Sequence, residues 1–159
     1  MLKINISVVS FILCALVAPQ VFADNSKAPT PGASVPKITL GNGIANWIVT
    51  EGATRKGATF TFREVQIDGD GWLVMHPFKD GRPAGEVYVG STYIKDGINR
   101  NVEITVDEEP APGTMFLVML HLDVNGNHDF DFVFVDERNV LDKAVFEGTM
   151  MIAHPIAAP

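Results

Sequence analysis

The stretch ATFTFREVQIDGDGWLVMHPF, residues 58–78, decides the fold class. Its first half alternates Phe60 and Phe62 with polar residues, the period-two pattern of a strand with one buried face. The DGDG sequence at 68–71 predicts a tight turn, because Asp-Gly supplies the positive φ angles that two-residue hairpin turns require. The mostly apolar residues 72–78 follow, so we expect the two halves to pair as a β-hairpin.

Short runs rich in β-branched and aromatic residues continue outward from this stretch, separated by Gly, Pro, Asp and Asn. A spacing of roughly ten residues between such runs is typical of antiparallel strands. Further strands are predicted at 86–94, 102–106, 115–122, 130–135 and 145–153, with one or two edge strands within 37–50. Seven to eight strands predict an all-β fold, an antiparallel immunoglobulin-like β-sandwich whose strand order the sequence leaves open.

One of these runs, MFLVMLHL at 115–122, is apolar on both faces until His121. This pattern predicts either a central strand that is covered on each side or a strand with a large exposed hydrophobic face. We expect 130–135 to be its hairpin partner, joined to it through the stretch HLDVNGNHDFDF at 121–132.

The N-terminus has the features of a secretory signal peptide over residues 1–23: one early Lys, then an uncharged and mostly apolar run that ends in small residues. We place the cleavage between Ala23 and Asp24. An uncleaved membrane anchor is disfavoured because its apolar core is shorter than the ~20 residues of a span. A lipoprotein cut at Cys14 is disfavoured because Leu13 stands where a small residue is needed.

The predicted mature chain begins with a Pro-rich segment, 24–36, which has no apolar run and therefore predicts a flexible tether. A single β-sandwich domain is expected over 37–155, and the final IAAP carries nothing that demands order. The chain has one cysteine, Cys14, which cleavage would remove. An exported domain without disulfides has to be stabilised by its core.

The charge of the chain excludes several classes of partner. Its 12 Lys and Arg stand against 19 Asp and Glu, a net charge of −7. An acidic surface repels nucleic acid and anionic lipid, so we expect neither as a partner. Removal of residues 1–23 would leave no expected membrane span. The expected location is periplasmic or extracellular.

The order of four motifs resembles an uncharacterised exported immunoglobulin-like β-sandwich domain family, a domain of unknown function found in secreted proteins of halophilic archaea and bacteria. The matching pieces are Trp72–His76, Ala84–Ser91, Gly97–Val106 and His121–Phe132. The resemblance covers about Ala58 to Ala153 and implies a β-sandwich outside the cell, without an assigned activity or catalytic residue. This chain departs from the archaeal pattern in its less acidic composition and single-domain form.

Oxygen-bearing side chains at alternate positions predict a candidate calcium site: Asp123, Asn125, Asn127, Asp129 and Asp131. Calcium takes carboxylate, amide and carbonyl oxygens. The helix-loop-helix calcium motif is excluded, because its sixth and twelfth positions hold His128 and Phe134. Asp68 and Asp70 would add ligands if both acidic turns lie at one end. The alternative is a plain turn at Asn125-Gly126, since turns favour the same residue types.

Copper bound through histidine and methionine is a second metal hypothesis. The candidate ligands are His76, His121, His128 and His154, with Met75, Met119, Met150 and Met151. Met119 and His121 share one face of their predicted strand, whereas the absence of cysteine after cleavage excludes a blue-copper centre. The alternative is that the methionines fill gaps in the core and the histidines bond to the backbone.

Catalysis has little support in the sequence. The serines of the mature chain are Ser26, Ser34 and Ser91, none of them in a G-x-S-x-G motif. The neighbouring Glu108 and Glu109 do not provide carboxylates on opposite sides of a cleft, as glycoside cleavage requires.

Four aromatic residues suit either a surface that stacks on sugars or an ordinary core: Trp47, Trp72, Tyr88 and Tyr93. We therefore expect a non-catalytic binding or structural module with a protein or glycan partner at the cell envelope and no required cofactor. A periplasmic metal-binding protein is the alternative, and an enzyme acting on envelope polysaccharide ranks third.

Overall fold

A computed structural model of the chain describes residues 37–132, 134–135, 138–139 and 141–159. These residues contain thirteen strands and no helix, and Val35–Pro159 forms one compact unit. The predicted all-β sandwich is confirmed. The predicted signal peptide (1–23) and tether (24–36) lie outside the described residues. Within the described part, no helix is long and apolar enough to cross a membrane.

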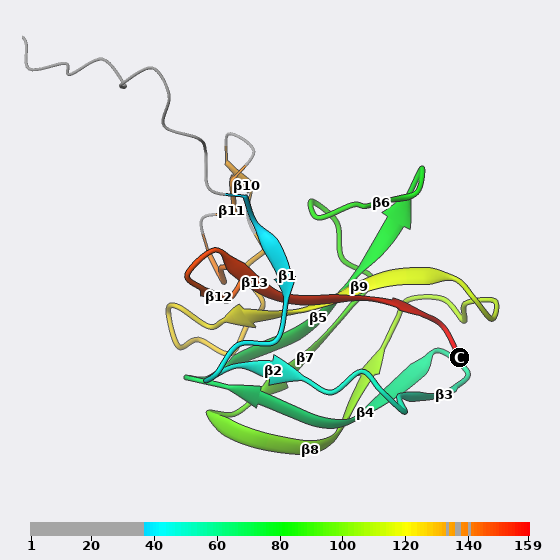
Figure 1. The fold of residues 1–159 in the computed structure, drawn as a ribbon, viewed down its shortest axis with the longest axis horizontal. Helices are drawn as coiled ribbons and strands as arrows, with labels where there is room; N and C mark the ends of the chain where they lie inside the picture. The colour runs from blue at the N-terminus through cyan, green and yellow to red at the C-terminus, as the bar shows by residue number, and fades with distance from the viewer. Residues whose placement is uncertain (1–36, 133, 136–137, 140) are drawn as a thin grey trace, which may run out of the picture. The chain divides into compact units, whose positions relative to one another are not determined.

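The larger sheet has seven strands in the described part of the chain (Figure 1). Its order is β1 (Thr39–Gly41), β13 (Met150–Ala157), β9 (Met115–Leu122), β5 (Gly71–Lys79) and β6 (Arg82–Pro83), with β12 (Phe146–Glu147) on β13 and β7 (Gly90–Ile94) on β5. Only the β1–β13 pair among these strands is parallel. β9 lies between β5 and β13 and is buried on both faces, so the prediction of a two-sided central strand is confirmed.

The smaller sheet has β4 (Thr59–Ile67) at its centre. β8 (Gly97–Thr105) pairs with one side of β4, and β2 (Trp47–Ile48) and β3 (Thr54–Lys56) pair with the other. In Figure 1, β4 and β8 form the layer beneath β5, β9 and β13.

The main core lies between the two sheets and contains side chains of both. Phe60 of β4 meets Phe116 of β9 edge to face, with ring centroids 5.6 Å apart. Burying large aliphatic and aromatic side chains here stabilises the fold by roughly 1.5–3 kcal/mol for each of them. Fully buried members include Phe60, Phe62, Ile67, Leu73, Met75, Ile104, Leu120 and Ile152.

The alternation of β4 shifts by one residue in mid-strand. Phe60 and Phe62 are buried, and the next buried position is Val65. The shift lies beside Asn101 of β8, whose φ of 51° interrupts the extended backbone. A local irregularity of this kind re-aims the side chains that follow it.

The predicted hairpin of 58–67 with 72–78 is wrong, because β4 and β5 belong to different sheets. Residues 68–70 carry the chain from one sheet to the other. β5 is buried on both faces over its first six residues, so it needs neighbours and cover on every side. It finds them in the middle of the larger sheet, between β9 and β7.

The predicted pairing of 115–122 with 130–135 is also wrong. Phe130 and Phe132 are outside any strand, and β10 (Phe134–Val135) pairs with β11 (Arg138–Asn139) instead. Both edges of β9 are already paired, one with β5 and the other with β13. The segment after β9 is therefore a loop that packs on the sheet, and it does not form a hairpin with β9.

The C-terminal residues differ from expectation as well. The run 145–153 divides at Gly148, which has a φ of 62°, into β12 and β13. The final IAAP is paired and not loose: β13 continues to Ala157, and Ala158 exchanges backbone hydrogen bonds with the segment 113–114. Pro159 O accepts two hydrogen bonds from the Arg55 guanidinium.

Candidate functional site

The loop that follows β9 folds around the carboxylate of Asp123. Its Oδ1 accepts the backbone N–H of Gly126 at 2.8 Å, and its Oδ2 accepts that of His128 at 3.1 Å. Gly126 has a φ of 68° and His128 one of 63°, both in the left-handed region. Short polar side chains favour such turns because they bond to nearby backbone groups.

The other predicted calcium ligands gather at Asp131. Asn125 Nδ2 and Asn127 Nδ2 both donate to Asp131 Oδ2, at 2.7 Å and 2.8 Å. Asp129 joins through its backbone N–H, which bonds Asn127 Oδ1 at 2.9 Å. The structure thus brings together the side chains of Asn125, Asn127 and Asp131. The Asp123 carboxylate bonds to the loop backbone, and Asp129 takes part through its backbone N–H.

A buried carboxylate that the sequence analysis missed supports this loop. Asp142 Oδ1 accepts the N–H of Val124 at 3.3 Å, and Oδ2 accepts that of Asp131 at 2.6 Å. Burial raises the pKa of Asp142, against the lowering effect of these backbone hydrogen bonds. No local sequence signal distinguishes Asp142 from an exposed loop carboxylate, because the groups it contacts lie far back in the chain.

The two acidic turns lie at one end of the sandwich, since Asp123 N donates to the Asp70 carbonyl at 3.1 Å. The Asp70 side chain is engaged elsewhere, because its Oδ2 accepts hydrogen bonds from Lys95 Nζ at 2.8 Å and Tyr93 Oη at 2.9 Å. The Lys95 ammonium and the N–H of Asp96 hold the pKa of Asp70 at about 2. The Asp70 carboxylate therefore forms an ion pair with Lys95 and makes no contact with the predicted calcium ligands in the described part of the chain.

Apolar and aromatic side chains cover the outer face of the larger sheet, the face away from the main core. We call six of them the aromatic–histidine cluster: Trp72, His76, Tyr88, His121, Phe130 and Phe132. The imidazoles of His76 and His121 have centroids 5.6 Å apart, and both contact Phe132, at 5.5 Å and 5.7 Å. Phe130 and Phe132 stack on each other at 5.4 Å. The loops before β7 and after β9 thus cover the two histidines.

Both buried histidines are held by backbone carbonyls. His76 Nδ1 lies 2.6 Å from Val87 O, and His121 Nδ1 lies 2.5 Å from Asp142 O. Burial lowers the pKa of His76, and it lowers that of His121 to about 4. Both imidazoles are therefore neutral at pH 7.

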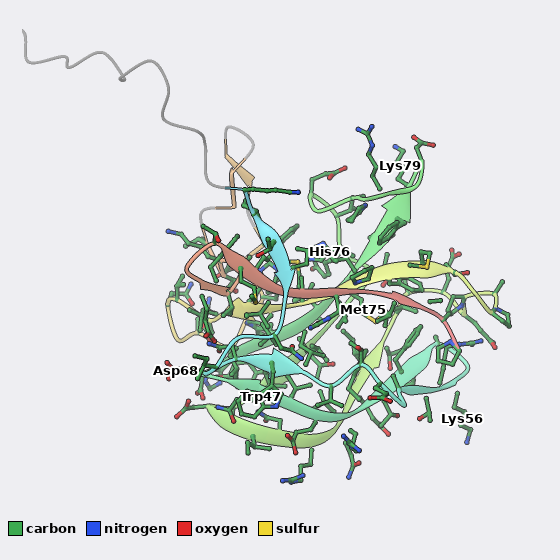
Figure 2. All side chains as sticks on the ribbon, viewed as in Figure 1. Trp47, Lys56, Asp68, Met75, His76 and Lys79 are labelled. Atoms are coloured by element: carbon green, nitrogen blue, oxygen red, sulfur yellow. The ribbon has the colours of Figure 1, made fainter. Side chains whose placement is uncertain are left out.

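The remaining copper candidates do not gather with this pair. His128 is exposed and lies against Tyr93 with ring centroids 4.5 Å apart, and His154 Nε2 contacts Asn42 Oδ1 at 2.7 Å. Met75 points into the main core, next to His76 on β5 (Figure 2). Met119 shares the outer face with His121. Among the described residues, no three of His, Cys, Asp and Glu are arranged to hold a metal.

The residues considered for catalysis or for stacking on sugars lie at several places in the fold. Ser91 lies within β7, whereas Ser26 and Ser34 fall outside the described residues. Glu108 and Glu109 line a pocket of about 350 Å³, and Glu109 lies 3.7 Å from Arg55 Nη1. Trp72 is buried against Tyr93, and Trp47 Nε1 donates to Glu64 at 3.2 Å. The four aromatic residues named from the sequence therefore do not form one exposed surface.

The fold and the loop clusters define a β-sandwich module. A family model described as "Domain of unknown function (DUF7282)" matches residues 47–154, and the chain belongs to this family. Over 76 residues, or 48% of this chain, it is 29% identical to Cell surface glycoprotein 2 of Haloarcula hispanica. The chain spans 8% of that relative's length. No solved structure matches the chain.

Proposed function

We propose that the chain is an exported, non-catalytic β-sandwich module that serves a binding or structural role in the periplasm or at the cell surface. The observation that carries the proposal is the similarity of its β-sandwich to a segment of a cell surface glycoprotein. The segment is a small part of that relative, as expected of a module used in different chains. Its partner is a protein or glycan of the envelope.

Export is tested by expressing the full chain with a C-terminal epitope in its own host and separating cytoplasm, periplasm and medium. We expect the protein in the exported fractions, with an N-terminus at Asp24 by mass spectrometry. A chain that keeps Met1 and stays in the cytoplasm contradicts the proposal.

The non-catalytic role is tested with envelope polysaccharide. We expect co-sedimentation without release of sugars, and a Glu108→Gln/Glu109→Gln variant that behaves like the parent.

Calcium binding at the loop 123–131 is a second candidate function. It is favoured by one loop that holds the carboxylates of Asp123 and Asp131 and the amides of Asn125 and Asn127, whose N–H groups occupy Asp131 Oδ2 in this structure. Oxygen donors of this kind suit a hard cation, and extracellular sites bind calcium at about 0.1–1 mM. Displacing the two amide N–H groups would free Asp131 as a ligand.

Thermal unfolding with and without about 1 mM CaCl₂ tests this site, because a ligand that binds the native state raises the melting temperature. We expect a rise that Asp123→Asn and Asp131→Asn abolish. Asp80→Asn is the matched control, since Asp80 is an exposed carboxylate outside both acidic turns and Asn tolerates its φ of 51°. If calcium leaves the melting temperature of the parent unchanged, the loop is a turn without an ion.

A further inference from the structure

The outer face of the larger sheet holds two histidines that the proposed module does not use. Alternate residues of β5 and β9 point to this face, and the register pairs Trp72 with His121 and Val74 with Met119. His76 has 0% of its surface exposed, His121 has 2% and Met119 has 5%. Histidine is rarely buried to this extent without a partner for each ring nitrogen.

The hydrogen bonds of each ring assign its tautomer. A carbonyl oxygen only accepts, so the contacts with Val87 O and Asp142 O place the proton on Nδ1 of both histidines. Nε2 of His76 and of His121 each keep a lone pair. Both atoms are buried and have no hydrogen-bond partner within the described residues. A carbonyl on Nδ1 that fixes the tautomer is the usual support of an imidazole that binds a metal through Nε2.

The two imidazole rings share one enclosure. The rings lie 5.6 Å apart at 31°, and Phe130 and Phe132 contact them from the loop after β9. Tyr88, which is 40% exposed, packs against both phenylalanines from the loop before β7. Loops and not strands therefore cover the pair, and loops open at lower cost than a sheet.

The chemistry of the enclosure selects the kind of ion. Two neutral imidazoles leave a divalent ion with both charges uncompensated among aromatic rings, which is costly. A monovalent ion leaves only one positive charge uncompensated. The buried side chain that can carry a negative charge belongs to Asp142, whose backbone carbonyl is bonded to His121. Imidazole and thioether are ligands of Cu⁺, and Met119 supplies a thioether on the same face.

We propose that His76 Nε2 and His121 Nε2, with the Met119 thioether beside them, bind one Cu⁺ ion beneath the lid of Tyr88, Phe130 and Phe132. This site is separate from the calcium loop and does not depend on the module function proposed above.

The first test uses the parent protein, purified without a histidine tag and labelled with ¹⁵N. Ag⁺, a redox-stable substitute for Cu⁺, is added up to one equivalent, and imidazole nitrogens are followed by NMR. We expect the Nε2 signals of His76 and His121 to move, with those of His128 and His154 unchanged. No shift, or shifts at His128 or His154 instead, overturns the proposal. In that case a buried water donating to both Nε2 atoms and accepting from Trp72 Nε1 is the better account.

The second test measures Cu⁺ affinity anaerobically by competition with bicinchoninate. His76→Phe and His121→Phe keep a ring in the enclosure and should each weaken binding at least about 100-fold, whereas Met119→Leu should weaken it about 10-fold. His154→Gln is the control and should bind as the parent does. Retained Cu⁺ affinity in folded His76→Phe or His121→Phe overturns the proposal. A parent protein that is saturated by Zn²⁺ but does not bind Cu⁺ overturns it as well. If these variants do not fold, the NMR titration of the parent decides.

Discussion

The backbone carbonyl of Asp142 accepts the Nδ1–H of His121 at 2.5 Å. The carboxylate of the same residue accepts two backbone N–H groups of the loop after β9. Asp142 thus connects the aromatic–histidine cluster to the candidate calcium loop. A change at this residue is expected to affect both.

Replacing Asp142 with Asn tests this connection. Asn tolerates the φ of 41° at this position, but its amide presents a donor to a backbone N–H. A buried donor left without an acceptor costs about 1–3 kcal/mol, so we expect a loss of that size in urea unfolding. Asp129→Asn, an exposed change in the same loop, is the control and should remain within about 0.5 kcal/mol. Equal losses in both variants contradict the supporting role of Asp142.

Gly71 is the first residue of β5, and the backbone of β9 leaves no room for a side chain at this position. A Cβ at this position would lie 2.2 Å from His121 O and 2.7 Å from Ile67 Cδ1. We expect Gly71→Ala to lower the free energy of unfolding by about 1–3 kcal/mol, because strands must shift to accept the methyl group.

Gly85→Ala is the matched control for Gly71→Ala, since a Cβ there meets nothing within 4 Å. Its effect should remain within about 0.5 kcal/mol. Two variants of equal stability by urea unfolding would show that β5 and β9 do not approach each other this closely.

Leu120 tests the main core at the centre of β9. Its side chain is fully buried between the sheets. Leu120→Ala should destabilise the protein by about 2–5 kcal/mol, from lost burial and the cavity left behind. Ile98→Ala removes a side chain that is 53% exposed and should cost far less. A small effect at Leu120 would contradict its place in the core.

The ion pair of Asp70 with Lys95 predicts a pH dependence. The pKa of Asp70 is about 2 in the folded protein, below its ordinary value of 3.8. A carboxyl with a lowered folded pKa stabilises the protein above its unfolded pKa, and this contribution is lost as the pH falls from about 4 to about 2.

Asp70→Asn should therefore lower stability near neutral pH and flatten its decline between pH 4 and pH 2, measured by urea unfolding at each pH. Asp68→Asn, in the same turn, is the control. If Asp70→Asn leaves the acid-induced decline as steep as in the parent, the ion pair does not contribute to it.

Local features of the sequence predict the parts of this protein that depend on near neighbours. Burial was predicted correctly for the alternating Phe60 and Phe62 and for the two-sided run 115–122. Successive side chains of a strand point to opposite faces, so the sequence pattern indicates which faces are buried. The gathering of Asn125, Asn127 and Asp131 was predictable for the same reason, since all three lie within seven residues. Whether an ion binds there stays a prediction.

Strand pairing was not predictable in the same way. The DGDG stretch suits a hairpin turn and a crossing between sheets equally well, so it does not say that β4 pairs with β8 and β5 with β9. The difference depends on which arrangement buries both faces of β5, a property of the whole core.

The sequence alone thus determined an all-β protein, the burial of its strands and the polar loop after β9, since these follow from residue types at short spacing. Tertiary structure alone decided that His76 and His121 lie together beneath Phe130 and Phe132, with Nδ1 of each held by a distant carbonyl. The physical reason is that the four histidines look alike in the sequence, whereas burial and hydrogen bonding depend on segments that meet only when the sheet forms.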